Sequence, residues 1–226
     1  MNLLLMRHAE SVGNRESRIQ GRVDYILSEQ GVEQAHALGQ ALVEQSWPPT
    51  YIYTSPLQRA IHTSDILRDY WATRGLSITI QALPDLQEVK NGVLEGLTWV
   101  EAQAQYPDLC NALTASPDWL PIPGAETLKA CRDRAHQAFQ SLITQHSNHD
   151  RLWVISHGGF LQYLIGAVMG CDRIWGITIP PTAIFEFELD IERWDKTDQN
   201  RYNALLWRIR RFNDAEHLKS LVADFS

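Results

Sequence analysis

Two short apolar runs, far apart in the chain, each end in a histidine. Residues 3–6 are too few for a helix and are interpreted as a buried strand, which is followed by Arg7 and His8. Residues 152–156 form a second apolar strand, which is followed by His157 and two glycines. Ligands bind outside the carboxyl ends of the strands in open α/β sheets. We therefore expect the guanidinium and the two imidazole groups to gather at one ligand site.

An arginine and a glutamate from two further segments are candidates for the same site. The sequence SPLQ at 55–58 predicts a helix start, with Ser55 as the N-cap and Gln58 closing a capping box. Arg59 then lies in the first helical turn, where free N–H groups and the helix dipole favour an anion. Glu88 stands in a loop punctuated by glycines, and such a loop can carry a carboxylate to a cleft.

This combination of side chains fits phosphoryl transfer. Two guanidinium groups and a histidine at one spot need a compact polyanion to balance their mutual repulsion. Phosphate suits them, because arginines and helix-start amides stabilise charge on its equatorial oxygens without a metal, and imidazole can be the nucleophile. No metal site is predicted, since the HxxH pair at 146–149 lacks a third ligand and the three cysteines have no metal-type spacing. No cofactor is expected either.

Composition limits the classes of partner. The chain has 226 residues and a formal net charge of −7, and its basic residues are scattered, so no nucleic acid and no anionic membrane surface is expected as a partner. The N-terminal apolar run is too short for a signal peptide, and no later segment approaches membrane-spanning length. We therefore expect a soluble, cytoplasmic protein that acts on a small phosphorylated metabolite. A homodimer is compatible with the sequence.

The order of apolar and amphipathic segments predicts an α/β fold, in which three α/β/α layers surround a mostly parallel central sheet with an antiparallel edge strand. Strands are expected at residues 3–6, 51–54, 77–82, 152–156, 183–189 and 204–211. Helices are expected at residues 28–45, 55–74, 98–106, 128–146 and 160–169. No linker divides the chain, so residues 1–226 are predicted to form one domain, with 85–125 as an inserted loop or lid region and 107–125 as a covering loop.

Five sequence blocks, which occur in one order, resemble the histidine phosphatase superfamily, a family that includes cofactor-dependent phosphoglycerate mutases. They are RHAES at 7–11 with Asn14, SPLQRA at 55–60, ExxxGxxEG at 88–96, GAET at 124–127 and SHGG at 156–159. Each block alone is weak, whereas five blocks in the same order are specific. The resemblance runs from residue 2 to about residue 170, and RFND at 211–214 with HL at 217–218 resembles the closing segment of the family.

The resemblance implies a role for each candidate residue. His8 would be the phosphorylated nucleophile, and Glu88 would donate a proton to the leaving oxygen and then activate water. The phosphoryl oxygens would be bound by Arg7, Arg59 and His157. Substrate-binding positions would come from the loop after the first strand and from the second histidine segment, namely Ser11, Asn14, Gln20, Gly21 and Gly158.

Phosphatases and mutases of this family share the site and differ in whether water or a hydroxy acid receives the phosphoryl group. Mutases of the family usually carry a longer, basic insertion after the acidic residue, and an asparagine after the His-Gly pair. Here Lys90 is the only cation between Glu88 and Lys129, and position 159 is a glycine. We therefore expect the phosphatase branch. A cofactor-dependent phosphoglycerate mutase is the alternative, and a catalytically inactive module that binds a phosphorylated ligand or a protein partner is the second alternative.

Overall fold

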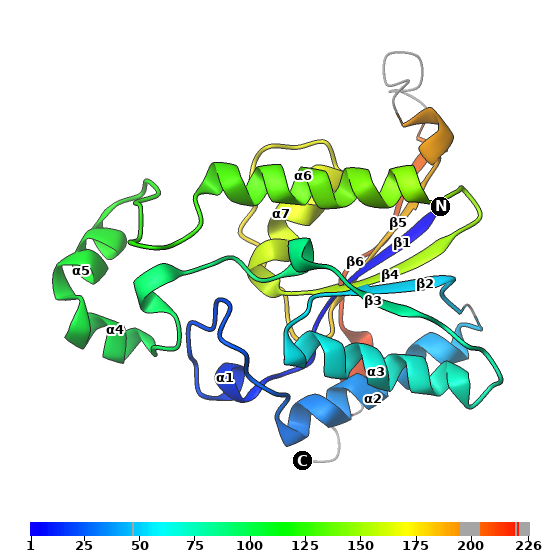
Figure 1. Ribbon diagram of the computed structural model, residues 1–226, viewed down its shortest axis with the longest axis horizontal. Coiled ribbons are helices and arrows are strands. Elements are labelled where there is room, and N and C mark those ends of the chain that lie inside the picture. Colours follow the sequence, from blue (N-terminus) through cyan, green and yellow to red (C-terminus); the bar gives the residue numbers. More distant parts are fainter. Residues whose placement is uncertain (47, 195–203, 220, 222–226) are drawn as a thin grey trace.

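The computed structural model describes residues 1–46, 48–194, 204–219 and 221, and its centre is a six-stranded sheet in the order β3-β2-β4-β1-β5-β6 (Figure 1). The strands are β1 (Asn2–Arg7), β2 (Tyr51–Thr54), β3 (Ile80–Ala82), β4 (Arg151–Ser156), β5 (Ile184–Leu189) and β6 (Trp207–Asp214). The pairs β1/β4, β4/β2 and β2/β3 are parallel, whereas β5 is antiparallel to β1 and β6 is antiparallel to β5. The mostly parallel sheet with an antiparallel edge is confirmed. The third strand is shorter than expected, and the last lies further along the chain than 204–211.

The central strands β1 and β4 set the position of the two histidines. Leu3 and Met6 of β1 are fully buried, as expected for a parallel strand that is covered on both faces. In the register of this pair Arg7 lies opposite Ser156, and the backbone N–H of His8 donates to Ser156 O at 2.9 Å. The two segments therefore leave the sheet side by side, at the carboxyl ends of two neighbouring strands.

Four helices cover the two faces of the sheet and complete the expected three layers (Figure 1). They are α2 (Glu29–Glu44), α3 (Gln58–Ala72), α6 (Leu128–Gln145) and α7 (Gly158–Val168). On one face, Leu3 of β1 belongs to the same buried cluster as Phe139 of α6. On the other face, Leu4 belongs to the same buried cluster as Leu38 of α2. Alternate residues of a strand point to opposite faces, so β1 contributes to both halves of the core.

Two short helices, α4 (Trp99–Gln105) and α5 (Pro107–Ala115), lie beside the sheet and its covering helices (Figure 1). The expectation of a covering loop at 107–125 is wrong for its first half, because Pro107 begins α5 at a position where a missing N–H is no loss. Leu109 and Leu113 of α5 pack against the small cluster that contains Leu94. Further short elements are α1 (Val12–Arg15) and the 3₁₀ turns Pro84–Leu86, Gly92–Leu94, Ile191–Arg193 and Glu216–Leu218. A lid role for 85–125 stays a prediction.

The start of α3 differs from the expectation at Ser55. The helix begins at Gln58, no side chain caps it, and Arg59 is its second residue. The Ser55 hydroxyl instead lies 2.7 Å from His157 Nε2, and it accepts a hydrogen bond from the backbone N–H of Leu57 at 3.3 Å. The predicted capping box is therefore wrong, because the serine stands too far ahead of the helix and orients the second histidine.

Candidate active site

His8 lies just beyond the end of β1 and is only 2% exposed. Its Nδ1 atom is 2.6 Å from the backbone oxygen of Ala9. Because a carbonyl oxygen only accepts, Nδ1 carries the ring proton and Nε2 keeps a lone pair. The Nε–H group of Arg59 donates to this Nε2 at 3.3 Å. The ring is thus held in the tautomer that a nucleophile with Nε2 as the attacking atom requires.

The fully buried His157 faces His8 across the same guanidinium group. Arg59 Nε lies 3.2 Å from His157 Nδ1, so one N–H group is shared between the two rings. The centroids of the rings are 5.0 Å apart at an interplanar angle of 60°. Since Nδ1 accepts from Arg59, Nε2 of His157 carries the proton and donates to the Ser55 hydroxyl. Ser55 therefore fixes the tautomer of the second histidine.

Arg59 also connects the histidines to the loop that follows β1. Its Nη1 donates to Val23 O at 2.8 Å, and its Nη2 donates to Gly21 O at 2.9 Å. Gly21 has a φ of +49°, and a Cβ atom there would overlap the side chain of Glu95. A glycine is needed at this position for both reasons. The predicted site residue Gly21 is thus placed against the guanidinium group by main-chain geometry.

Arg7 approaches the histidines from the end of β1. Its Nη1 donates to Ile179 O at 2.6 Å. Its Nε is buried and has no hydrogen-bond partner among the described residues. A Cβ atom at Gly158 would lie 3.3 Å from this Nε, so glycine at that position leaves room beside it. A buried donor of this kind is suited to an oxygen of a bound anion.

The Glu88 carboxylate lies at the N-terminus of α7, the helix that directly follows His157 in the chain. Its Oε1 accepts from the backbone N–H groups of Val89 and Phe160, both at 2.8 Å, and its Oε2 accepts from Gly159 N at 3.1 Å. A Cβ atom at Gly159 would come within 2.6 Å of Glu88 Oε1. The second glycine after the histidine therefore makes this position of the carboxylate sterically accessible.

The electrostatics of the site favour neutral imidazoles beside charged guanidinium groups. Burial holds the pKa of His8 well below its usual range, and the positive charges of Arg7 and Arg59 lower it further. Burial also lowers the pKa of His157, helped by His8 and by the arginines. Burial lowers the pKa of Arg59 to about 10, against the effect of Glu88. At neutral pH, His8 is therefore in its nucleophilic form within a positively charged site.

Three further predicted residues, Ser11, Asn14 and Gln20, form one small network. Ser11 caps α1, and its hydroxyl lies 2.9 Å from Asn14 Oδ1 and 2.7 Å from Gln20 Oε1. Gln20 is the neighbour of Gly21, which contacts Arg59. The structure thus joins these residues to the loop beside the site. Their contact with a substrate stays a prediction.

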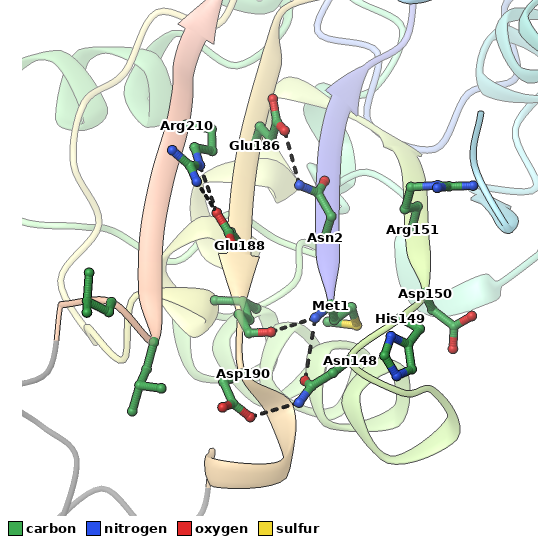
Figure 2. A pocket seen from close by; sticks show the side chains of 13 residues that line it. Met1, Asn2, Asn148, His149, Asp150, Arg151, Glu186, Glu188, Asp190 and Arg210 are labelled. Atoms are coloured by element: carbon green, nitrogen blue, oxygen red, sulfur yellow. Dashed lines mark hydrogen bonds and ion pairs between the residues drawn. The ribbon is translucent and has the colours of Figure 1, made fainter. Parts of the chain in front are cut away.

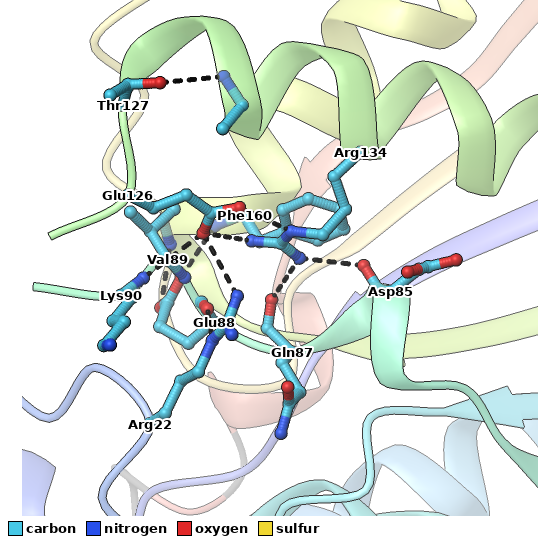
Figure 3. A network of polar contacts seen from close by, with 12 residues as sticks. Arg22, Asp85, Gln87, Glu88, Val89, Lys90, Glu126, Thr127, Arg134 and Phe160 are labelled. Carbon is cyan, nitrogen blue, oxygen red and sulfur yellow. Dashed lines mark hydrogen bonds and ion pairs between the residues drawn. The ribbon is translucent and has the colours of Figure 1, made fainter.

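The predictions from sequence missed a partly buried ionic network around the Glu88 segment (Figure 3). Arg134 of α6 binds Glu126 through two hydrogen bonds of 2.8 Å, and Arg22 binds the same carboxylate at 3.2 Å. Arg22 also donates to the backbone oxygen of Glu88 at 3.1 Å. Glu126 belongs to the GAET block, which was a usable signal. An arginine in the interior of an amphipathic helix carries no comparable signal.

The side chains nearest the two histidines are guanidinium groups and not a set of metal ligands. Among the residues that the structure describes, no group of three or more His, Cys, Asp or Glu side chains could hold a metal ion. His146 of the HxxH pair instead lies 2.8 Å from the Tyr53 hydroxyl through its Nε2. The two guanidinium groups already supply the positive charge that phosphoryl transfer requires.

A hollow of about 860 Å³ lies at the start of β1, where Met1 and Asn2 line it (Figure 2). His8 and His157 follow the other ends of β1 and β4. Its charged side chains largely bind one another. Arg210 Nε donates to Glu188 Oε2 at 2.8 Å, and Asn2 Nδ2 donates to Glu186 Oε1 at 3.1 Å. We assign no ligand to this hollow, because its arginine and glutamate side chains bind partners within the protein and it is remote from His8.

Comparison with known proteins shows the family of the chain. The model of the histidine phosphatase superfamily (branch 1) matches residues 3–201. The chain is 32% identical to the metal-independent phosphoserine phosphatase of Arabidopsis thaliana over 161 residues, which cover 71% of this chain and 65% of the relative, slightly less than two thirds of its length. It is 28% identical over 227 residues to the probable phosphoglycerate mutase GpmB of Erwinia tasmaniensis, covering 99% of this chain and 98% of the relative.

A solved structure gives the same result for the fold. The structure of Bacillus stearothermophilus YhfR superimposes with a TM-score of 0.78 at 26% sequence identity, covering 96% of this chain and 98% of that chain. The family match extends over most of the sequence and includes the segments that carry His8, Arg59, Glu88 and His157. The chain therefore belongs to branch 1 of the histidine phosphatase superfamily.

Proposed function

We propose that the protein is a phosphomonoester hydrolase that acts on a small phosphorylated metabolite through a phosphohistidine intermediate, without a metal. The observation that carries this proposal is the environment of His8. Its Nδ1 proton is directed to Ala9 O, and its Nε2 lone pair faces the guanidinium group of Arg59. Arg7 offers a buried Nε donor from the adjacent position. This arrangement presents a neutral nucleophile and cationic donors to the same phosphoryl group.

In the first step, His8 Nε2 attacks phosphorus, the N–P bond forms, and the bond to the ester oxygen breaks. Arg7 and Arg59 donate to the equatorial oxygens, so the Arg59 Nε–H turns from the histidines to the phosphoryl group. His157 joins them once the negative charge of the phosphoryl group has favoured a proton on its Nδ1 atom. A protonated Glu88 transfers its proton to the leaving oxygen, and an alcohol departs. The Nδ1–H group of His8 keeps its hydrogen bond to Ala9 O while the imidazole becomes positively charged.

In the second step, the Glu88 carboxylate takes a proton from a water molecule that attacks the phosphohistidine. The N–P bond breaks, inorganic phosphate leaves, and His8 returns to its neutral form. Glu88 is protonated again and ready for the next ester. The backbone donors at the start of α7 hold this carboxylate close to the phosphoryl site in its ionised state.

Two observations support hydrolysis over the mutase reaction. The name of the Arabidopsis relative supports a metal-independent phosphatase and makes phosphoserine the first substrate to test. A Cβ atom at Gly159 would lie 2.6 Å from Glu88 Oε1, so the asparagine expected of a mutase would require the Glu88 carboxylate to shift from its place at the start of α7. The name of the Erwinia relative keeps phosphoglycerate mutase as the alternative to exclude.

The proposal extends to the partner and the compartment. We propose a small phosphorylated metabolite as the partner, with no nucleic acid and no membrane contact, in the cytoplasm. The scattered basic residues and the net charge of −7 support this. No helix within the described ranges is long and apolar enough to cross a bilayer. A homodimer is compatible with the proposal.

The test is capture of the intermediate. Protein is mixed with phosphoserine labelled in its phosphate and quenched with alkali, and the bound label is expected to be base-stable and acid-labile. His8→Ala is expected to abolish it, whereas His146→Ala, at a histidine that contacts Tyr53, leaves it unchanged. Label on His8→Ala at the wild-type level would overturn the proposal. A parallel assay with 3-phosphoglycerate and 2,3-bisphosphoglycerate should form little 2-phosphoglycerate relative to free phosphate.

A further inference from the structure

Arg134 of α6 binds the main chain just before Glu88 (Figure 3). Its Nη1 donates to Asp85 O at 2.8 Å and to Gln87 O at 2.7 Å. These two carbonyl groups belong to the residues that lead directly into Glu88. The guanidinium group is rigid and planar, so bonds to two carbonyls fix the direction of this chain segment as well as its position.

Arg134 also reaches the group that binds the Glu88 carboxylate. Its guanidinium carbon lies 3.8 Å from the centroid of the Phe160 ring, and the backbone N–H of Phe160 donates to Glu88 Oε1 at 2.8 Å. A cation stacked on an aromatic face fixes the ring of that residue. Arg134 therefore acts on both ends of Glu88, on the main chain before it and on the helix start that holds its carboxylate.

Glu126 completes the arrangement from the other side of Glu88. It accepts two hydrogen bonds from Arg134 and one from Arg22, and its own backbone N–H donates to Lys90 O at 2.9 Å. Although burial raises the pKa of Glu126, the two arginines and the Lys90 backbone bring it below its usual value. The two ends of the segment between Glu88 and Glu126 are therefore held together beside the Arg134–Glu126 ion pair, which is nearly buried.

We propose that Arg134, held by Glu126, is a positioning residue that sets the place of the Glu88 carboxyl group beside the phosphoryl site. This inference rests on the proposed function, in which Glu88 protonates the leaving oxygen. The contacts found for the Arg134 guanidinium are Glu126, the carbonyls of Asp85 and Gln87, and the Phe160 ring. It acts through Glu88, and its loss should resemble the loss of a well-placed proton donor.

The leaving group separates this role from simple stabilisation of the fold. An alkyl phosphate such as phosphoserine needs a proton on its leaving oxygen, whereas p-nitrophenyl phosphate needs little. Loss of folded protein lowers both rates by the same factor. Displacement of Glu88 lowers the rate for the alkyl ester far more, because a misplacement of about 1 Å can cost about 100-fold in rate.

The experiment compares wild type, Arg134→Met and Arg134→Lys on both esters, with kcat/KM taken per folded protein. We expect Arg134→Met to lose about 10- to 100-fold on phosphoserine and less than about threefold on p-nitrophenyl phosphate. Lys129→Met, which removes an exposed ion pair with Asp133 on the same helix, is the matched control and should change neither rate. If Arg134→Met does not fold, Arg134→Lys tests the same point, because it keeps the positive charge and loses the planar set of guanidinium donors. The same larger loss on phosphoserine than on p-nitrophenyl phosphate is expected of it.

A double variant tests whether Arg134 acts through Glu88. In Glu88→Gln, the selective loss on phosphoserine should already be present, and adding Arg134→Met should increase it by less than about twofold, because residues that act as one unit are not additive. Equal losses on both esters, or full multiplication of the two effects, would overturn the inference while the proposed function stands. Failure of the proposed function would be visible separately, as a wild-type protein that hydrolyses neither ester.

Discussion

Acidification should destabilise the folded protein through His8 and His157, because both rings are buried and neutral. Burial holds both pKa values well below the usual range, and the neighbouring arginines add to this effect. Well above about pH 6.5 both rings are neutral in the folded and the unfolded state, so their ionisation does not change the free energy of unfolding. As the pH falls below this value, the two histidines take up protons in the unfolded chain but stay neutral in the folded protein, and the free energy of unfolding decreases.

The magnitude follows from the unfolded pKa alone when the folded site takes up no proton. One histidine with an unfolded pKa of about 6.5 then costs about 2 kcal/mol of stability between pH 7 and pH 5. The two rings together cost about 4 kcal/mol at this limit, which is a large part of the stability of a typical domain. His217 adds to the loss, because burial lowers its pKa as well. The effect should appear below about pH 6.5 and should be absent between pH 7 and pH 8.

Urea unfolding followed by tryptophan fluorescence at pH 7, 6 and 5 measures this effect. Phosphate buffers are avoided, since an anion that binds the folded state would stabilise it. The double variant His8→Asn with His157→Asn should lose up to about 4 kcal/mol less than wild type over this range. His149→Asn, at an exposed histidine, is the control and should behave as wild type. The same pH dependence in the double variant and in wild type would refute the view that these rings are held neutral.

Two further outcomes follow from the site. Gly159→Asn should displace Glu88, whose Oε1 lies 2.6 Å from the place of a Cβ atom there, and should lower kcat/KM for phosphoserine about 10-fold or more relative to p-nitrophenyl phosphate. Gly176→Asn, where a Cβ atom meets nothing within 4 Å, is the control, and equal behaviour of the two variants would contradict this explanation. EDTA should leave turnover unchanged, because the arginines supply the positive charge. Loss of activity that a divalent ion restores would show that the charge stabilisation is assigned wrongly.

The histidines and the sheet could be predicted because their signals are local. A short run that is apolar at every position indicates a strand covered on both faces. In open α/β sheets, ligands bind just outside the carboxyl ends of such strands. The runs before His8 and His157 are of this kind, and they are the central pair β1 and β4. Arg59 was placed correctly at a helix start, although the start itself is at Gln58.

The errors and omissions concern residues whose role depends on partners distant in sequence. A serine before a proline favours a capping box, and only the presence of His157 next to it shows that Ser55 serves another purpose. Prolines in the segment after Pro107 suggested a loop, yet Leu109 and Leu113 already have the spacing of a helix face. Arg134 could not be recognised, because its partners come from three parts of the chain that meet only in the folded protein.

The pairing of β1 with β4 has a consequence for how this site can vary. Neighbouring strands lie about 4.8 Å apart, and the ring centroids of the two histidines that follow β1 and β4 are 5.0 Å apart. The distance between the two histidine rings is thus set by main-chain hydrogen bonding between their strands. It cannot be adjusted in small steps, since a slip of one residue would turn a whole strand to the other face. If the proposed function holds, a change in the organic part of a substrate must be accommodated by the loops around the sheet, while the place proposed for the phosphorus atom stays the same.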